Sequence, residues 1–196
     1  MIGEVEQDSL DDEGAALLNK IRFTRALLRN PKSVGAVVPS SMQLAEQMVE
    51  ALPADATVVV EFGGGTGPVT KAVLDSGFAP ENLYVFEWSE QLYKHLSGKF
   101  PTVNIVHACA SDIVQLDCDV SGIISSLPLK SLSDDTVAEI LAAALQKLRP
   151  GGYFVQFTYD LVKYHRLFDQ GFRHVSKRLV WANLPPARID VFQKIS

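Results

Sequence analysis

The sequence predicts an α/β fold, a doubly wound and mostly parallel sheet with an antiparallel strand at its C-terminal end. Short apolar, β-branched runs alternate with helical segments through the middle of the chain, as in strand–helix–strand crossovers. A glycine-rich turn directly follows the first of these runs and precedes a helix. Two extended runs close the chain as a strand pair, and an N-terminal amphipathic helix precedes the whole series.

The predicted elements follow one another in a regular order. Strands are expected over residues 57–61, 82–87, 103–107, 120–125, 153–158, 174–181 and 187–194. Helices are expected from Ser40 or Ser41 to about Leu52 and over residues 68–76, 89–99 and 134–148, the last stopping at Arg149-Pro150-Gly151-Gly152. This order predicts one sheet with helices on both of its faces.

Composition and charge narrow the class of protein. A length of 196 residues fits one domain, and a net charge of −5 argues against a general nucleic-acid binder. No window approaches the roughly 18 apolar residues of a membrane span, and the acidic N-terminus is unlike a secretory signal, so we expect a cytoplasmic protein. Cys109 and Cys118 are too few for a disulfide framework or a zinc site and are expected to be reduced thiols.

Charge is unevenly distributed near the N-terminus. Residues 1–13 carry six acidic side chains and no basic one, and we expect this tail to be disordered. Residues 17–32 carry five basic side chains and no acidic one. On a helix over residues 14–31, apolar and basic side chains form separate stripes, so this segment is amphipathic. The remaining residues, 32–196, are expected to form the main domain.

The strongest motif is the run Glu61-Phe62-Gly63-Gly64-Gly65-Thr66-Gly67 at the end of the first predicted strand. The spacing of Gly63, Gly65 and Gly67 differs from the nicotinamide fingerprint, in which a pyrophosphate lies on the helix N-terminus. Glu61 favours a cationic ligand over a diphosphate. S-adenosylmethionine carries a sulfonium and an ammonium and no phosphate, so we expect it as the cofactor. Glu87, at the end of the second strand, is expected to accept the ribose hydroxyls.

The motif order resembles that of class I S-adenosylmethionine-dependent methyltransferases, whose domain is Rossmann-like. The closer likeness is to bacterial phospholipid N-methyltransferases, which methylate phosphatidylethanolamine toward phosphatidylcholine, and the ribosomal RNA adenine dimethyltransferases are similar more distantly. The likeness is carried by the glycine-rich turn and by residues 30–41, 125–129 and 183–187. It implies an S-adenosylmethionine-dependent N-methyltransferase with S-adenosylhomocysteine as product and no metal.

The expected adenine site departs from that family. The loop after the third strand commonly reads Gly-Asp-Ala, whereas this chain has Ala108-Cys109-Ala110, so the usual carboxylate is missing. Backbone contacts at Ala110, with Asp112 as a substitute acid, are expected near the adenine. Trp88 either packs against the adenine face or serves as an ordinary packing aromatic.

The expected acceptor site lies at the carboxyl ends of the fourth and fifth strands, where ligands of α/β sheets bind. Carbonyls or hydroxyls of Ser125, Ser126 and Leu127 are expected to orient the acceptor amine. His165 is the expected proton taker near neutral pH, and Tyr159 and Tyr164 are expected to contact a phosphate or the forming cation. The alternative is that these three are surface residues of a connecting segment.

A lipid acceptor gives the N-terminal helix a function. Its basic stripe would meet anionic lipid phosphates while its apolar stripe enters the membrane interface. This predicts peripheral association with the inner face of the cytoplasmic membrane, through Lys20, Arg22, Arg25 and Arg29. The alternative is an amphipathic helix packed on the domain.

The sequence therefore predicts transfer of methyl groups from S-adenosylmethionine to the headgroup amine of phosphatidylethanolamine. Two other functions stay open: an RNA adenine or small-molecule N-methyltransferase on the same fold, and a non-catalytic module that binds a nucleoside. The negative net charge argues against RNA as the acceptor. The altered third-strand loop keeps the non-catalytic alternative open.

Overall fold

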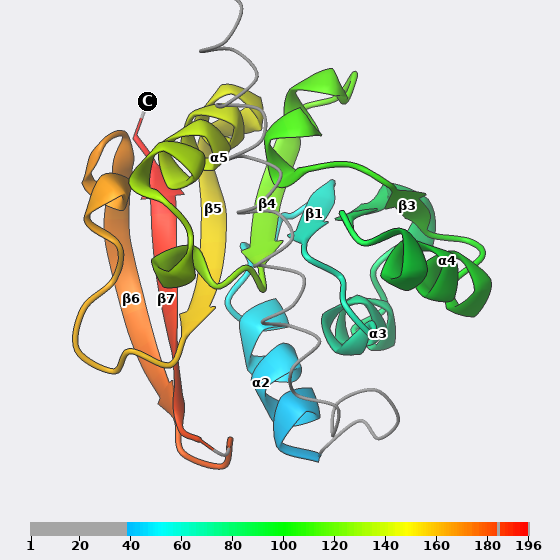
Figure 1. Ribbon diagram of the computed structural model, residues 1–196, viewed down its shortest axis with the longest axis horizontal. Helices are drawn as coiled ribbons and strands as arrows, with labels where there is room; N and C mark the ends of the chain where they lie inside the picture. Colours follow the sequence, from blue (N-terminus) through cyan, green and yellow to red (C-terminus); the bar gives the residue numbers. More distant parts are fainter. Residues whose placement is uncertain (1–38, 184, 196) are drawn as a thin grey trace, which may run out of the picture. The chain divides into compact units, whose positions relative to one another are not determined.

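The computed structural model describes residues 39–183 and 185–195. They form a seven-stranded sheet in the order β3-β2-β1-β4-β5-β7-β6, and Figure 1 shows it with β6 at the left. The neighbouring pairs from β3 to β5 are parallel, whereas β7 is antiparallel to both β5 and β6. The predicted mostly parallel, doubly wound sheet with an antiparallel C-terminal strand is confirmed. The strands are β1 Val59–Phe62, β2 Leu83–Phe86, β3 Asn104–Val106, β4 Val120–Ser125, β5 Leu148–Thr158, β6 Phe172–Val180 and β7 Ala187–Lys194.

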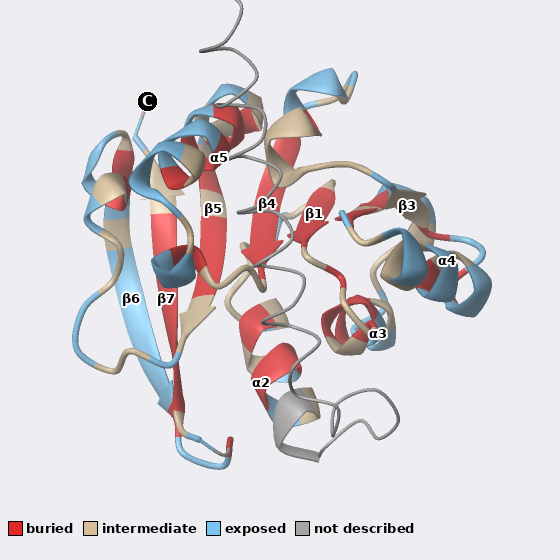
Figure 2. Cartoon of the chain, viewed as in Figure 1, coloured by how far each residue is buried: buried red, intermediate tan, exposed pale blue. Residues whose placement is uncertain are grey.

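Helices cover both faces of this sheet. Met48 and Val73 belong to one buried apolar cluster, and Ile140 and Phe154 belong to another. Because side chains alternate between the faces of a strand, the two clusters lie on opposite sides of the sheet. In Figure 2 the central strands are mostly buried, whereas β6 is exposed along most of its length. The helices are α2 Pro39–Val49, α3 Pro68–Asp75, α4 Glu90–Lys99 and α5 Asp134–Lys147, with 3-10 turns η2 Pro80–Asn82, η3 Ala110–Gln115, η4 Leu129–Ser131 and η5 Arg166–Asp169.

Capping residues explain where three helices begin. Gly67 has a φ of 86° and precedes Pro68, which occupies the first turn of α3 and lacks the N–H that would be unpaired there. Ser89 caps α4, since its side chain accepts a hydrogen bond from Leu92 N. Ser133 caps α5 in the same way, and acidic side chains follow it in the first turn. These helix starts match the predicted ones closely because caps are local signals.

The largest departure from the predicted elements is in β5. This strand begins at Leu148 rather than at Tyr153, and residues 149–152 bulge out where its register with β4 shifts. Pro150 has no N–H to donate, and Gly151 has a φ of 75° that a regular strand does not adopt. The turn signal therefore marks a bulge inside the strand and not the start of the strand.

Several of the other expectations concern residues outside the described part of the chain. The predicted acidic tail and the predicted helix over residues 14–31 lie outside them, and so do Lys20, Arg22, Arg25 and Arg29. The helix expected after Ser40 or Ser41 begins at Pro39 and ends at Val49. Within the described chain, no helix is both long enough and apolar enough to span a membrane.

Candidate active site

The glycine-rich turn joins the carboxyl end of β1 to α3. Gly63, Gly65 and Gly67 have φ values of 77°, 57° and 86°, a region that other residues rarely adopt. A methyl group on Gly67 would lie 2.4 Å from Phe100 Cε2, so this glycine lets the segment after α4 pack closely. A methyl group on Gly65 would meet no atom within 4 Å among the described residues. Among the described residues, Gly65 therefore leaves its backbone uncovered, as a ligand cradle requires.

Glu61 is fully buried at the end of β1. Its Oε2 accepts a hydrogen bond of 2.6 Å from Thr70 Oγ1, whereas its Oε1 has no hydrogen-bond partner in the described part of the chain. Burial raises the pKa of Glu61 to about 7; the Thr70 hydrogen bond opposes this and the nearby Glu87 adds to it. A cationic ligand beside the unpartnered oxygen would favour the ionised carboxylate.

Glu87 follows β2 and connects it to the glycine-rich turn. Its Oε2 accepts from Gly65 N at 2.9 Å, and its Oε1 accepts from Ser89 N at 2.8 Å. Each carboxylate oxygen has a second lone pair, so Glu87 can hold these amides and still accept hydroxyl groups of a ligand. The side chain is held at the position where the sequence predicts the ribose.

These three features fit S-adenosylmethionine. The unpartnered Glu61 oxygen suits a cationic group, the open backbone at Gly65 admits a ligand closely, and Glu87 retains acceptor capacity for a ribose diol. When bound, this cofactor supplies a methyl group on a positively charged sulfur. Among the described residues, no group of three or more His, Cys, Asp or Glu side chains is arranged to hold a metal ion.

The loop after β3 forms the 3-10 turn η3, which is not among the elements predicted from the sequence. Asp112 caps this turn, because its Oδ2 accepts from Cys109 N at 2.9 Å. Asp112 thus holds the loop that begins with Ala110, in addition to any contact with a ligand. Trp88 is 42% exposed next to Glu87, and its carbonyl lies 3.0 Å from His107 Nε2.

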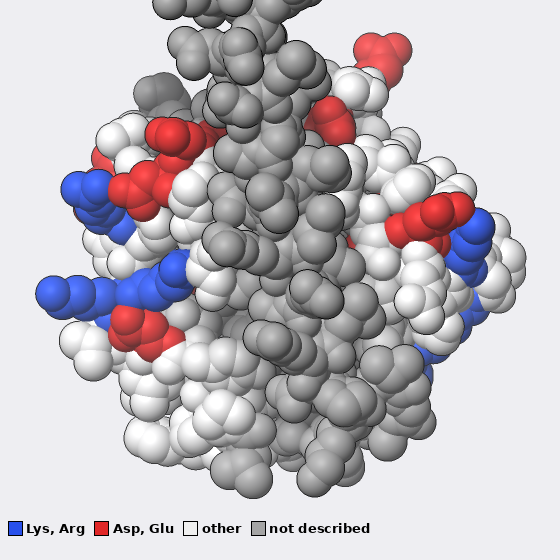
Figure 3. Space-filling model, viewed as in Figure 1, with Lys and Arg blue, Asp and Glu red and all other residues white. Residues whose placement is uncertain are grey.

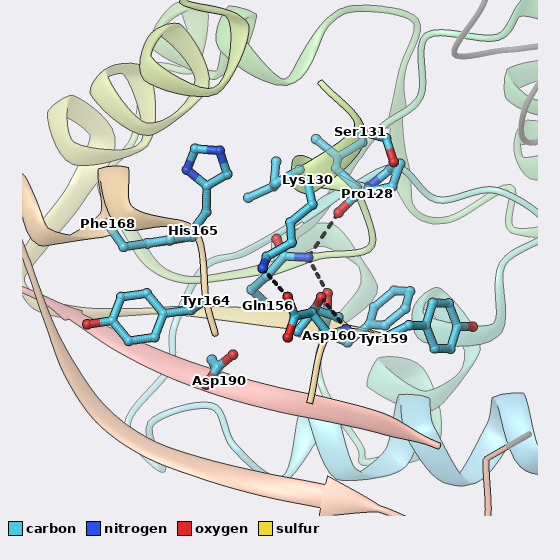
Figure 4. A pocket seen from close by; sticks show the side chains of 14 residues that line it. Pro128, Lys130, Ser131, Gln156, Tyr159, Asp160, Tyr164, His165, Phe168 and Asp190 are labelled. Carbon is cyan, nitrogen blue, oxygen red and sulfur yellow. Dashed lines mark hydrogen bonds and ion pairs between the residues drawn. The ribbon is translucent and has the colours of Figure 1, made fainter. Parts of the chain in front are cut away.

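A cavity of about 200 Å³ lies at the carboxyl ends of β4 and β5. Four of the predicted acceptor-site residues, Leu127, Tyr159, Tyr164 and His165, line it together (Figure 4). Ser125 is fully buried and accepts from Leu127 N at 3.4 Å, and neither it nor Ser126 lines the cavity. The complete lining is Leu127, Pro128, Leu129, Lys130, Ser131, Gln156, Phe157, Thr158, Tyr159, Asp160, Tyr164, His165, Phe168 and Asp190.

Leu127 connects this cavity to the glycine-rich turn. A methyl group built on Gly63 would lie 3.0 Å from Leu127 Cδ2, and the same leucine lines the cavity. The two predicted halves of the site are therefore neighbours, which methyl transfer between two bound groups requires.

Both ring nitrogens of His165 have partners within the protein. Nδ1 lies 3.4 Å from Leu167 N, from which it accepts, and Nε2 lies 3.4 Å from Asp134 Oδ1. Burial lowers the pKa of His165, which favours the neutral ring. This arrangement leaves no ring nitrogen open to the cavity, and it favours a shaping role over the predicted proton-taking role.

The two predicted tyrosines differ in how firmly they are held. Tyr164 stacks on His174 with ring centroids 5.0 Å apart, and its hydroxyl donates to Asp169 at 2.9 Å, which raises the pKa of that hydroxyl. Tyr159 is 55% exposed and makes an edge contact with Phe157. The Tyr164 ring is thus a fixed wall of the cavity, whereas Tyr159 lies at its rim.

Sequence reasoning missed the buried polar side chains in the cavity floor. Gln156 and Asp190 line the cavity, and Arg188 and His174 hydrogen-bond to Asp190. The available signal was a polar residue between apolar neighbours in each strand run, Gln156 between Val155 and Phe157 and Asp190 between Ile189 and Val191. Such a residue does not reveal its partners before the strands are paired.

Charges on the described surface are mixed. In Figure 3, acidic and basic side chains lie beside one another over both α4 and α5, wherever described residues are visible. Two ion pairs join side chains of opposite charge here: Lys94 with Glu90 at 2.6 Å, and Arg166 with Asp134 at 2.7 Å. No run of one sign appears among the visible described residues, unlike the basic surface of a typical RNA binder.

Comparisons with known proteins agree with this geometry. No protein-family model matches the chain. An ornithine lipid N-methyltransferase from Singulisphaera acidiphila is 28% identical over 175 residues, which cover 84% of this chain and 91% of that protein. Two solved structures share the fold. The 1,6-didemethyltoxoflavin-N1-methyltransferase of Burkholderia thailandensis has a TM-score of 0.68, 19% identity and coverage of 94% and 90% of this chain and that one. N-methyltransferase NodS of Bradyrhizobium japonicum has a TM-score of 0.67, 12% identity and coverage of 91% and 99%.

The sheet order, the glycine-rich turn and the acid after β2 are those of the Rossmann-like fold that class I S-adenosylmethionine-dependent methyltransferases share. Both solved structures contain S-adenosylhomocysteine, which is the product of the cofactor expected from the sequence. Within this class the chain is similar to a lipid N-methyltransferase, and the resemblance predicted from the motifs is confirmed.

Proposed function

We propose that this chain transfers methyl groups from S-adenosylmethionine to the headgroup amine of a membrane lipid, with phosphatidylethanolamine as the acceptor. The observation that carries the proposal is the cavity that adjoins the glycine-rich turn through Leu127. Its lining combines aromatic rings with a few polar groups, which suits a small amine that becomes a cation during the reaction.

In the proposed reaction, the lone pair of the neutral amine nitrogen forms a bond to the methyl carbon. The carbon–sulfur bond breaks and its electron pair stays on the sulfur, so the product nitrogen carries the positive charge. The chain holds the amine in line with the carbon–sulfur bond, and positioning of this kind supplies several kcal/mol. The rings of Tyr159 and Tyr164 line the cavity and would contact the forming cation. Since His165 offers no open nitrogen, we assign to solvent at the cavity mouth the loss of the N–H proton that must precede each transfer.

Lipid is the favoured acceptor class for two reasons. The curated relative acts on a lipid amine, and its alignment with this chain covers most of both proteins. In addition, the basic stripe over residues 17–32 would bring the chain to an anionic membrane surface, on the cytoplasmic side where such lipids lie. Ornithine lipid is the second candidate acceptor, because it is the named substrate of that relative.

The test is a methyl-transfer assay with labelled S-adenosylmethionine and vesicles that contain anionic lipid and either phosphatidylethanolamine or ornithine lipid. Label in phosphatidylethanolamine supports the proposal, and separation of the products shows how many methyl groups are added. Label in ornithine lipid alone would assign the second acceptor. Absence of label in either lipid, while calorimetry detects cofactor binding, would contradict a lipid acceptor.

Two variants control this assay. Glu61→Ala removes the carboxylate beside the glycine-rich turn, and we expect roughly a hundredfold weaker cofactor binding with the fold retained. Glu139→Ala changes an exposed glutamate on α5 and is expected to leave binding unchanged. Unchanged cofactor binding by Glu61→Ala would remove Glu61 from the site.

A further inference from the structure

A buried polar row crosses the sheet beneath the cavity. Ser125 of β4 pairs in register with Gln156 of β5, which pairs with Asp190 of β7. Directly paired residues point to the same face of a sheet, and here it is the face covered by α5. The next row on that face, two residues further into each strand, is apolar: Ile123, Phe154 and Phe192. The polarity therefore changes at the carboxyl edge of the sheet, where the cavity lies.

The amide of Gln156 can adopt only one orientation in this row. Its Nε2 donates to Leu127 O at 2.9 Å and to Phe157 O at 2.6 Å, as the dashed lines in Figure 4 show. The flipped amide would place Oε1 against two carbonyl oxygens and lose both hydrogen bonds. The nitrogen is thus fixed on the Leu127 side, and Oε1 is fixed as an acceptor on the other.

The Gln156 side chain is only 6% exposed, and its Oε1 atom is buried. This oxygen has no hydrogen-bond partner among the described residues. Its neighbour Asp190 is satisfied in contrast, because its oxygens meet Arg188 Nε at 2.8 Å, Arg188 Nη2 at 2.7 Å and His174 Nε2 at 3.0 Å. A buried acceptor without a donor destabilises a fold. Gln156 therefore brings a neutral, buried hydrogen-bond acceptor without a partner among the described residues to the wall of the cavity.

We propose that Gln156 Oε1 accepts an N–H of the acceptor amine and so selects primary and secondary amines. The inference rests on the proposed function and extends it to the number of methyl groups. A neutral primary amine has two N–H groups, a secondary amine has one, and a neutral tertiary amine has none. The carboxamide bears no charge, so it can hold the neutral amine and keep its hydrogen bond as the ammonium forms. Gln156 then assists the first and second transfers and contributes nothing to the third.

The test compares Gln156→Met with the wild-type chain on vesicles of phosphatidylethanolamine, its monomethyl form and its dimethyl form. Methionine keeps the length of the side chain and removes the acceptor. We expect kcat/KM to fall about tenfold for the first two lipids and less than about twofold for the third. Gln193→Met is the matched control, since Gln193 is a β7 glutamine that donates to Gly151 O outside the cavity. We expect this control to change none of the three ratios.

A second measurement does not depend on the third transfer. Glycerophosphoethanolamine has N–H groups and glycerophosphocholine has none, so the wild-type chain should be inhibited more strongly by the first compound. Gln156→Met should lose this difference. An equal loss of kcat/KM for all three lipids together with an unchanged inhibitor preference would overturn the assignment and leave Gln156 as a support for Leu127. No labelled lipid with the wild-type chain would instead contradict the proposed function itself.

Discussion

The cofactor end and the acceptor end of this site are built in different ways. The cofactor end consists of residues 61–67 and Glu87, which lie at two adjacent strand ends and shape the backbone locally. The acceptor end brings together side chains from the loop after β4, the segment after β5, and β7. The first depends on glycine conformations and on two acids, and the second depends on strand pairing. Substitutions in the two regions should therefore affect different measurements.

The largest effect is expected from the buried acid of the cofactor end. The pKa of Glu61 is about 7 in the fold and has its ordinary value of 4.5 in the unfolded chain, so between these pH values Glu61 ionises mainly in the unfolded state. The free energy of unfolding of the unliganded chain should therefore fall relative to Glu61→Gln as pH rises from about 4.5 to 7, by up to about 3 kcal/mol. Denaturant melts at several pH values measure this, and a constant difference between the two proteins would contradict it.

Two glycines of the turn should separate stability from ligand binding. Gly67→Ala places a methyl group 2.4 Å from Phe100 at a positive φ, and we expect a loss of about 2 kcal/mol of stability. Gly65→Ala meets open space, so it should cost about 1 kcal/mol of stability while weakening cofactor binding more than Gly67→Ala does. Thermal melts and calorimetry provide the two readouts. Equal effects of both variants on binding would mean that Gly65 does not face the cofactor.

Leu127 should affect methyl transfer more than cofactor binding, because it lies between the turn and the cavity. We expect Leu127→Ala to lower kcat/KM about tenfold by loosening the acceptor, with cofactor affinity changed less than about twofold. Leu132→Ala is the matched control, since Leu132 is a partly buried leucine of the same apolar cluster that does not line the cavity. Similar losses in both variants would indicate a general effect on stability.

The smallest effect is expected at the N-terminal basic stripe. Each basic residue near an anionic membrane contributes about 1 kcal/mol, so Arg25→Gln should weaken binding to anionic vesicles about fivefold. The affinity of the wild-type chain should also fall as salt rises, because the interaction is screened. Vesicle sedimentation measures both effects, and Arg149→Gln in β5 is the control. Vesicle binding that is independent of salt would argue against an electrostatic membrane contact.

The elements differ in how closely their observed boundaries match those predicted from the sequence. Strand and helix boundaries near caps and glycines are close to the predicted ones, since these signals act within a few residues. The start of β5 differs from the predicted one, because a Pro-Gly pair predicts a turn both where a helix ends and where a strand bulges. The role predicted for His165 stays a prediction, but the structure adds a partner that the sequence did not indicate. Its partner Asp134 is distant in sequence, and only the fold brings the two together.

The sequence by itself determines the sheet class, the positive-φ turn and the two acids that flank it, because spacing along one strand and one turn dictates backbone geometry. Only the tertiary structure decides that Leu127 joins the turn to the cavity and that Ser125, Gln156 and Asp190 form one row. It also decides that one oxygen of Glu61 lacks a partner among the described residues. The physical reason is that burial and hydrogen-bond satisfaction depend on strands far apart in sequence. No local sequence pattern predicts which buried polar atom is left without a hydrogen-bond partner when these strands pair.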